Sequence, residues 1–250
     1  MPTKETSMNT SSTCRNDSDA ERAADRGILV WDAPVRVFHW LFTVCFAGAW
    51  LTAENEHWRL VHVTLGYTAG GLVIFRLAWG VIGTRYARFS SFVRGPARVS
   101  RYMLGLLHGH PQRYIGHNPA GAVAIVAMLA SACALTITGW ASYNDTGGTW
   151  LGELHEGVAN VMLILVGVHI TGVVVSSWLH RENLIGAMFS GRKTGQPDEA
   201  VRYARRGVAA LMLAAVLAFW WWQWHEAPVS LLSGRDATSA QQTRYSDSDD

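Results

Sequence analysis

Charged residues and cysteines are both scarce in this chain. Of its 250 residues, 16% are charged and 49% are hydrophobic. The charged residues gather in short Arg-rich clusters between long uncharged runs, which excludes a soluble globule and indicates a membrane protein. The three cysteines, Cys14, Cys45 and Cys133, are scattered, and the sequence has no C-x-x-C-H motif. This pattern argues against a disulfide framework and excludes covalent attachment of a c-type haem.

Both ends of the sequence are polar. Residues 1–27 are rich in Ser, Thr and Asp and poor in large apolar groups, and residues 227–250 end in SDSDD. We expect both stretches to be disordered tails, the first of them cytoplasmic. No short apolar core with a small-residue cleavage site stands near the start, so we expect no cleaved signal peptide.

Five apolar segments are long enough to cross a bilayer as helices, for which about 20 residues suffice. They cover residues 35–53, 60–82, 120–143, 151–179 and 207–224. We therefore expect an all-α membrane protein. The lipid bilayer is then one partner, and we expect no nucleic-acid partner.

The connections between these segments differ in charge. Those after the second and fourth segments are rich in Arg, whereas the other two read TAENEHW and NDTGGTW and contain no Lys or Arg. Arg59 is the only basic residue that borders this second side. The positive-inside rule places the N-terminus and the Arg-rich loops in the cytoplasm and the C-terminus in the periplasm. We therefore expect a multi-pass protein of the bacterial inner (plasma) membrane.

Four histidines lie within these segments at two matching depths. His155 and His169 are fourteen residues apart, or nearly four helical turns, so both lie on one helix face, roughly 21 Å apart along the axis. His39 lies near the cytoplasmic start of the first segment and His62 near the outer start of the second. His62 therefore matches His155 in depth, and His39 matches His169. Two bis-histidine haems stacked across the bilayer would need this arrangement.

Each of these residues also has a plainer interpretation. A single membrane histidine can hydrogen-bond a neighbouring helix, but four at two matched depths favour ligation. Arg36 and Arg76 could pair with haem propionates near the inner side, or they could simply lie near the cytoplasmic interface, Arg36 by snorkelling. Gly66 and Gly70 could give a macrocycle clearance or serve close helix packing.

We expect solvation in loops or at the interface to account for the other six histidines. They are His57, His108, His110, His117, His180 and His225. A zinc or copper site at His108 and His110 has two ligands but no obvious third.

Several motifs together resemble the bacterial cytochrome b561 family, which includes the b-type cytochrome subunits of membrane-bound nickel–iron hydrogenases. The resemblance covers residues 30–194, most of the chain. The motifs that carry it are WDAPVRVFHW, VHVTLGY, GHNPAGA, LHEGVANVMLILVGVHI and ENLIGAMFSGRK.

The resemblance implies a four-helix transmembrane bundle over residues 28–195, with two non-covalent b haems and axial ligands at His39, His62, His155 and His169. A fifth C-terminal transmembrane helix would then lie within residues 196–226. It also implies electron exchange between the quinone pool and a partner redox protein. We expect the partner to be periplasmic, either a c-type cytochrome or a hydrogenase subunit. The loop residues Tyr114, His117 and Asn118 are candidates for the quinone site. The fifth segment and both tails depart from the small four-helix members, and AFWWWQW is either an interfacial anchor or a docking surface.

Two other functions stay open from the sequence. The chain could be an enzyme, a quinone-coupled oxidase of a small oxidant such as superoxide, acting without an obligatory partner. It could also be a non-redox transporter or anchor whose histidines bind metal or protons, although ligands roughly 21 Å apart cannot share one metal. No catalytic acid–base pair or nucleophile is visible, so we expect an electron-transfer subunit rather than a stand-alone enzyme.

Overall fold

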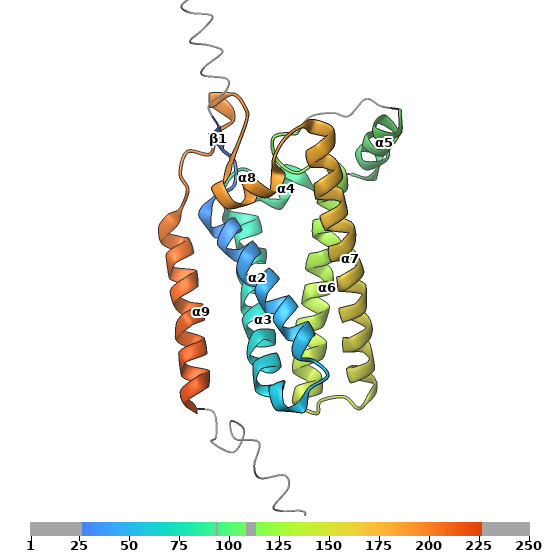
Figure 1. Ribbon diagram of the computed structural model, residues 1–250, viewed down its shortest axis with the longest axis vertical. Coiled ribbons are helices and arrows are strands. Elements are labelled where there is room, and N and C mark those ends of the chain that lie inside the picture. Colours follow the sequence, from blue (N-terminus) through green and yellow to red (C-terminus); the bar gives the residue numbers. More distant parts are fainter. Residues whose placement is uncertain (1–26, 94, 109–113, 227–250) are drawn as a thin grey trace, which may run out of the picture. The chain divides into compact units, whose positions relative to one another are not determined.

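The computed structural model describes residues 27–93, 95–108 and 114–226. Its long helices are α2 (Ala33–Thr52), α3 (Arg59–Ile82), α6 (Pro119–Tyr143), α7 (Trp150–His180) and α9 (Arg206–Glu226), as Figure 1 shows. All five are long and apolar enough to cross a membrane. The five spanning segments expected from the sequence are confirmed, with ends within two residues. The two tails expected to be disordered fall almost wholly outside the described residues.

Shorter elements fill the connections that the sequence analysis left as loops. They are β1 (Ile28–Leu29), η1 (Glu56–Trp58), α4 (Phe89–Phe92), α5 (Pro96–Leu107), α8 (Leu184–Ser190), β2 (Arg192–Lys193) and η2 (Pro197–Glu199). Asn183 starts α8, because its side-chain oxygen accepts a hydrogen bond from the Gly186 amide. Gly191 ends α8 with a positive φ of 79°, a conformation that glycine adopts without strain.

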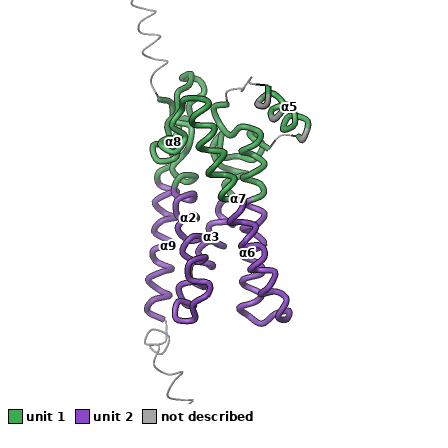
Figure 2. The backbone as a smooth tube through the Cα atoms, turned by 45° about the vertical axis from the view of Figure 1, so that its right-hand side comes forward, with its two compact units in different colours: residues 1–36, 78–127, 165–206 green, residues 37–77, 128–164, 207–250 purple. Residues whose placement is uncertain are grey.

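The described chain divides into two compact units that cut across the long helices (Figure 2). Unit 1 comprises residues 1–36, 78–127 and 165–206, and unit 2 comprises residues 37–77, 128–164 and 207–250. The division into a domain of residues 28–195 and an added helix within residues 196–226 stays a prediction.

Unit 1 contains two short strands that pair although they lie far apart in the sequence. Strands β1 and β2 run antiparallel, with Ile28 opposite Lys193 and Leu29 opposite Arg192. The buried side chains of Ile28, Val30, Trp31 and Ala187 form one apolar cluster beside the strands. This pairing fixes the start of α2 in unit 1 to the segment that follows α8.

Two buried charges reinforce unit 1. The Asp32 carboxylate accepts hydrogen bonds from the Trp79 indole at 2.9 Å, from the Thr84 hydroxyl at 2.8 Å and from the Val35 amide at 3.0 Å. The last of these caps the N-terminus of α2. Lys193 forms an ion pair with Glu182 at 3.2 Å. A charge that is buried without such partners would cost several kcal/mol, so these contacts are needed for folding.

In unit 2, α9 packs against α2 and α3. Buried Met212 and Val216 on α9 form one apolar cluster with Cys45 on α2 and Leu72 on α3. The Trp220 indole on α9 donates a hydrogen bond to the Thr68 hydroxyl on α3 at 2.9 Å. The fifth helix is therefore packed on the helices that carry His39 and His62.

Candidate cofactor site

His62 and His155 face each other in unit 2. His62 lies in the first turn of α3 and His155 in the second turn of α7. Their ring centroids are 6.3 Å apart, with an angle of 74° between the ring planes. An iron bound between two imidazole nitrogens at about 2 Å, the usual metal–imidazole distance, would leave the ring centroids about 6 Å apart. The two rings therefore fit the axial positions of one haem.

Each of these rings is oriented through its Nδ1 atom. Nδ1 of His62 lies 2.8 Å from the Ala49 carbonyl oxygen, so the ring donates its Nδ1 proton there. Nδ1 of His155 lies 3.1 Å from the Thr138 hydroxyl oxygen. That hydroxyl donates to the Ala134 carbonyl at 2.8 Å and is left to accept from His155. Protonated Nδ1 atoms leave the Nε2 lone pairs for a metal, as is usual for metal-binding histidines.

A cavity of about 240 Å³ opens beside the two rings. His62, His155, Gly139, Tyr143 and Arg59 are among the residues that line it. A Cβ atom on Gly139 would lie 2.9 Å from Cε1 of His155, so a larger residue there would displace the ring. The glycine gives the imidazole the clearance that it needs at this point of α6.

The two glycines proposed for cofactor clearance differ from each other. A Cβ atom on Gly70 would lie 2.7 Å from Cγ2 of Thr136, so Gly70 serves close packing between α3 and α6. A Cβ atom on Gly66 would have no neighbour within 4 Å, which leaves open space along this face of α3.

The second predicted histidine pair is divided between the units. His39 lies half-buried on α2 in unit 2, and His169 lies half-buried on α7 in unit 1. Helix α7 carries both His155 and His169 without interruption, as the fourteen-residue spacing predicts. The pairing of His39 with His169 stays a prediction.

The two arginines expected near haem propionates have different surroundings. Arg36 donates a hydrogen bond from Nη1 to the Phe189 carbonyl, at the end of α8 in unit 1. This hydrogen bond joins α2 to α8, so Arg36 stabilises the contact between these two helices. Arg76 is 5% exposed on α3 in unit 2, so its charge does not simply snorkel to water. Propionate binding by either residue stays a prediction.

His117 corrects one expectation from the sequence. Its ring does not project into solvent but lies 4.5 Å from the Trp31 ring and 4.8 Å from the Phe92 ring, centroid to centroid. This loop residue is therefore half-buried against two aromatic side chains of unit 1. Asn118 caps α6, because its side-chain oxygen accepts from the Gly121 amide at 2.7 Å. Two of the three quinone-site candidates, His117 and Asn118, therefore make contacts that stabilise unit 1.

Three of the remaining histidines are exposed, as expected. His57, His108 and His225 are exposed, whereas His180 is half-buried, and His110 lies outside the described residues. Within the described part of the chain, no group of three or more His, Cys, Asp or Glu side chains could hold a metal ion. A haem needs only two axial protein ligands, so a search for groups of three or more does not test the pair in unit 2.

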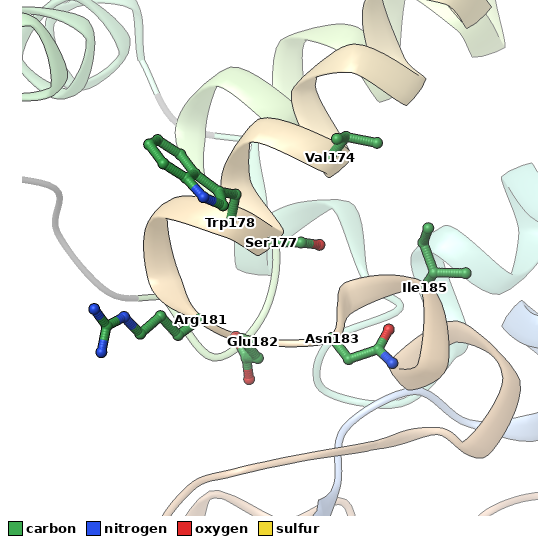
Figure 3. A pocket seen from close by; sticks show the side chains of 7 residues that line it. All are labelled: Val174, Ser177, Trp178, Arg181, Glu182, Asn183 and Ile185. Atoms are coloured by element: carbon green, nitrogen blue, oxygen red, sulfur yellow. The ribbon is translucent and has the colours of Figure 1, made fainter.

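A second cavity, of about 420 Å³, lies in unit 1. Figure 3 shows its lining, with Trp178 and Arg181 on one side and Asn183 and Ile185 on the other. It contains none of the predicted cofactor residues. Two of its polar side chains are already engaged, since Glu182 pairs with Lys193 and Asn183 caps α8.

Two residues at the site in unit 2, Thr138 and Ala49, are not predicted by the sequence analysis. Thr138 and the Ala49 carbonyl are far from the histidines that they orient, by 17 and 13 residues. Gly139 stood out only as one of several glycines within apolar segments. Helical periodicity does not reveal contacts between two different helices.

Several known proteins are similar to this chain over much of its length. The family model for prokaryotic cytochrome b561 matches residues 30–191. A protein of Rhizobium leguminosarum bv. viciae named a probable Ni/Fe-hydrogenase B-type cytochrome subunit is 25% identical over 71% of this chain and 93% of its own length. The Rhodobacter capsulatus protein of the same name is 24% identical over 78% of this chain and 91% of its own length.

A third relative matches a shorter part of the chain. An Escherichia coli K12 protein named a probable Ni/Fe-hydrogenase 1 B-type cytochrome subunit is 28% identical over 46% of this chain and 60% of its own length. No solved structure gives a significant match. The family match spans most of the chain and all four predicted ligands. The chain therefore belongs to the prokaryotic cytochrome b561 family and is a membrane b-type cytochrome that uses haem b in electron transport.

Proposed function

We propose that this protein carries electrons across the bacterial inner membrane through two b haems. His62 and His155 would ligate one haem, and His39 and His169 the other. The observation that carries the proposal is the 6.3 Å separation of the His62 and His155 rings, which suits one iron between them. When bound, haem supplies a one-electron iron couple with no open coordination site.

The protein's own groups would ligate, orient and enclose the cofactors. The Ala49 carbonyl and the Thr138 hydroxyl hold the Nδ1 protons of His62 and His155, so that Nε2 of each ring is the ligand. Arg36 and Arg76 would each bind a propionate of the inner haem by charge-assisted hydrogen bonds. The apolar helices exclude water, which keeps the charge of the iron in a low-dielectric setting.

The partners follow from orientation and from the relatives. The Arg-rich connections in unit 1 favour a cytoplasmic position for that side, with the N-terminus in the cytoplasm and the C-terminus in the periplasm. The relatives' names support a hydrogenase as the periplasmic partner, with a c-type cytochrome as the alternative. Quinone in the membrane would exchange electrons at the inner haem.

A reduced-minus-oxidised absorption spectrum of the purified protein, with haem quantified per chain, tests the proposal. We expect two non-covalent b haems in the wild type. His155→Ala and His169→Ala should each remove one, whereas His57→Ala, which replaces an exposed histidine, should remove none. Both haems retained in either ligand variant would overturn the pairing. A protein without haem would favour a transporter or anchor.

A separate experiment tests the partners. Reduction of the haems should occur with a hydrogenase and hydrogen, and a water-soluble quinone should then oxidise them. Reoxidation by quinone without reduction by hydrogenase would favour the c-type cytochrome. Oxidation of superoxide by the isolated chain would overturn the partner-dependent scheme.

A further inference from the structure

Arg59 lies at the mouth of the cavity that His62 and His155 line. It is the first residue of α3 and stands three residues before His62, so both side chains lie on neighbouring parts of one helix face. The rise between them is about 4.5 Å along the helix axis. Arg59 lines the same cavity as both rings. The described structure therefore brings one permanent positive charge beside the two predicted ligands.

Positive charge is rare in this unit. In its described residues, Lys and Arg occur only at Arg59 and Arg76, which are seventeen residues apart on α3. Acidic side chains are more common near the cavity, and one of them, Glu56, lines it. A ligand with carboxylates would need a cation here, and Arg59 is the cation that lines the cavity.

The present partner of Arg59 holds it weakly. Nη1 of Arg59 lies 3.0 Å from Oε1 of Glu56, and the two side chains are 62% and 85% exposed. An exposed ion pair of this kind contributes little, since solvent screens both charges. The guanidinium can therefore exchange Glu56 for a better acceptor at small cost.

Hydrogen-bond donors from a second helix also line this cavity. Ser142 and Tyr143, near the end of α6, line the cavity together with Arg59, and each carries a hydroxyl. Haem b has propionate carboxylates at one edge of its ring. A haem held between His62 and His155 needs charge-assisted hydrogen bonds for that edge, and a guanidinium fits a carboxylate with two parallel bonds.

We propose that Arg59 binds a propionate of the haem ligated by His62 and His155, and that its charge raises the midpoint potential of this haem. The proposal rests on the proposed function for the two histidine ligands. A positive charge beside the ring disfavours the more positive ferric state, which is why the potential rises. Arg59 thus positions the cofactor and tunes its potential.

The test uses the purified holoprotein and four variants: Arg59→Gln, Arg59→Lys, Glu56→Gln and Glu54→Gln. One readout is the rate of haem transfer to apomyoglobin, and the other is the midpoint potential of the haem that His155→Ala removes. Arg59→Gln should release this haem about tenfold faster, the low end for loss of a hydrogen bond to a charged group, and should lower its potential. Arg59→Lys should restore most of the potential.

The acidic variants separate the proposal from a simple surface ion pair. Glu56→Gln should shift the potential in the opposite direction, and Glu54→Gln, which replaces an acidic residue outside the cavity lining, should leave it unchanged. Wild-type release and potential in Arg59→Gln would overturn the proposal, as would equal shifts in Arg59→Gln and Glu56→Gln. A wild-type protein without haem at this site would instead refute the proposed function.

Discussion

Replacement of Thr138 by valine removes one hydroxyl group from the site in unit 2 and keeps the shape of the side chain. Thr138 is 6% exposed, and its oxygen lies 3.1 Å from Nδ1 of His155. The variant removes one acceptor of the Nδ1 proton but keeps the hydrogen bond between His155 and the Leu135 backbone, so the expected loss is that of one hydrogen bond, about 0.5–1.5 kcal/mol. A loss of about 1.4 kcal/mol corresponds to a tenfold change in an equilibrium constant. We therefore expect the affinity for this haem to fall by at most about tenfold.

The midpoint potential should change as well. The hydrogen bond from Nδ1 to Thr138 makes the imidazole a stronger electron donor, which favours ferric iron. Thr138→Val should therefore raise the potential of this haem, and Thr138→Ser should keep the wild-type value. The measurements are haem transfer to apomyoglobin and a redox titration followed by absorption.

Thr136→Val is the matched control, since Thr136 lies on the same helix and its hydroxyl donates to the Ala132 carbonyl. This variant should have little effect on either readout. Wild-type affinity and potential in Thr138→Val would refute the argument that Thr138 orients His155.

Three further predictions concern other parts of the chain. Gly139→Leu should remove the haem at His155 from the absorption spectrum, because a Cβ atom there lies 2.9 Å from the ring, whereas Gly66→Ala should keep it. Thr68→Val breaks the hydrogen bond from Trp220 and should lower the free energy of unfolding in detergent by about 0.6 kcal/mol, with an unchanged haem spectrum. Burial raises the pKa of Tyr86 above its usual value of 10.0. The unfolded chain then loses this proton first, so stability should decrease above pH 10.0, and Tyr86→Phe should weaken that dependence in thermal unfolding scans.

The sequence determined the five spanning helices almost to the residue. In a bilayer, every backbone polar group must be satisfied within the segment, so length and hydropathy alone specify a helix. The position of His155 and His169 on one helix follows for the same reason, because helical periodicity is a local property. The start and end signals of α8, Asn183 and Gly191, were also present in the sequence, although the sequence analysis left this stretch as a loop.

Tertiary structure alone decided which groups meet. The pairing of Ile28 with Lys193 joins residues 165 positions apart, and the ring of His117 packs against the rings of Trp31 and Phe92 although its loop is polar. The approach of His62 to His155, with Thr138 and Arg59 beside them, likewise depends on how separate helices pack. The hydrophobic pattern of a helix predicts which of its faces is buried. It does not predict which side chains of another helix contact that face, because shape complementarity and polar partners across the interface determine these contacts.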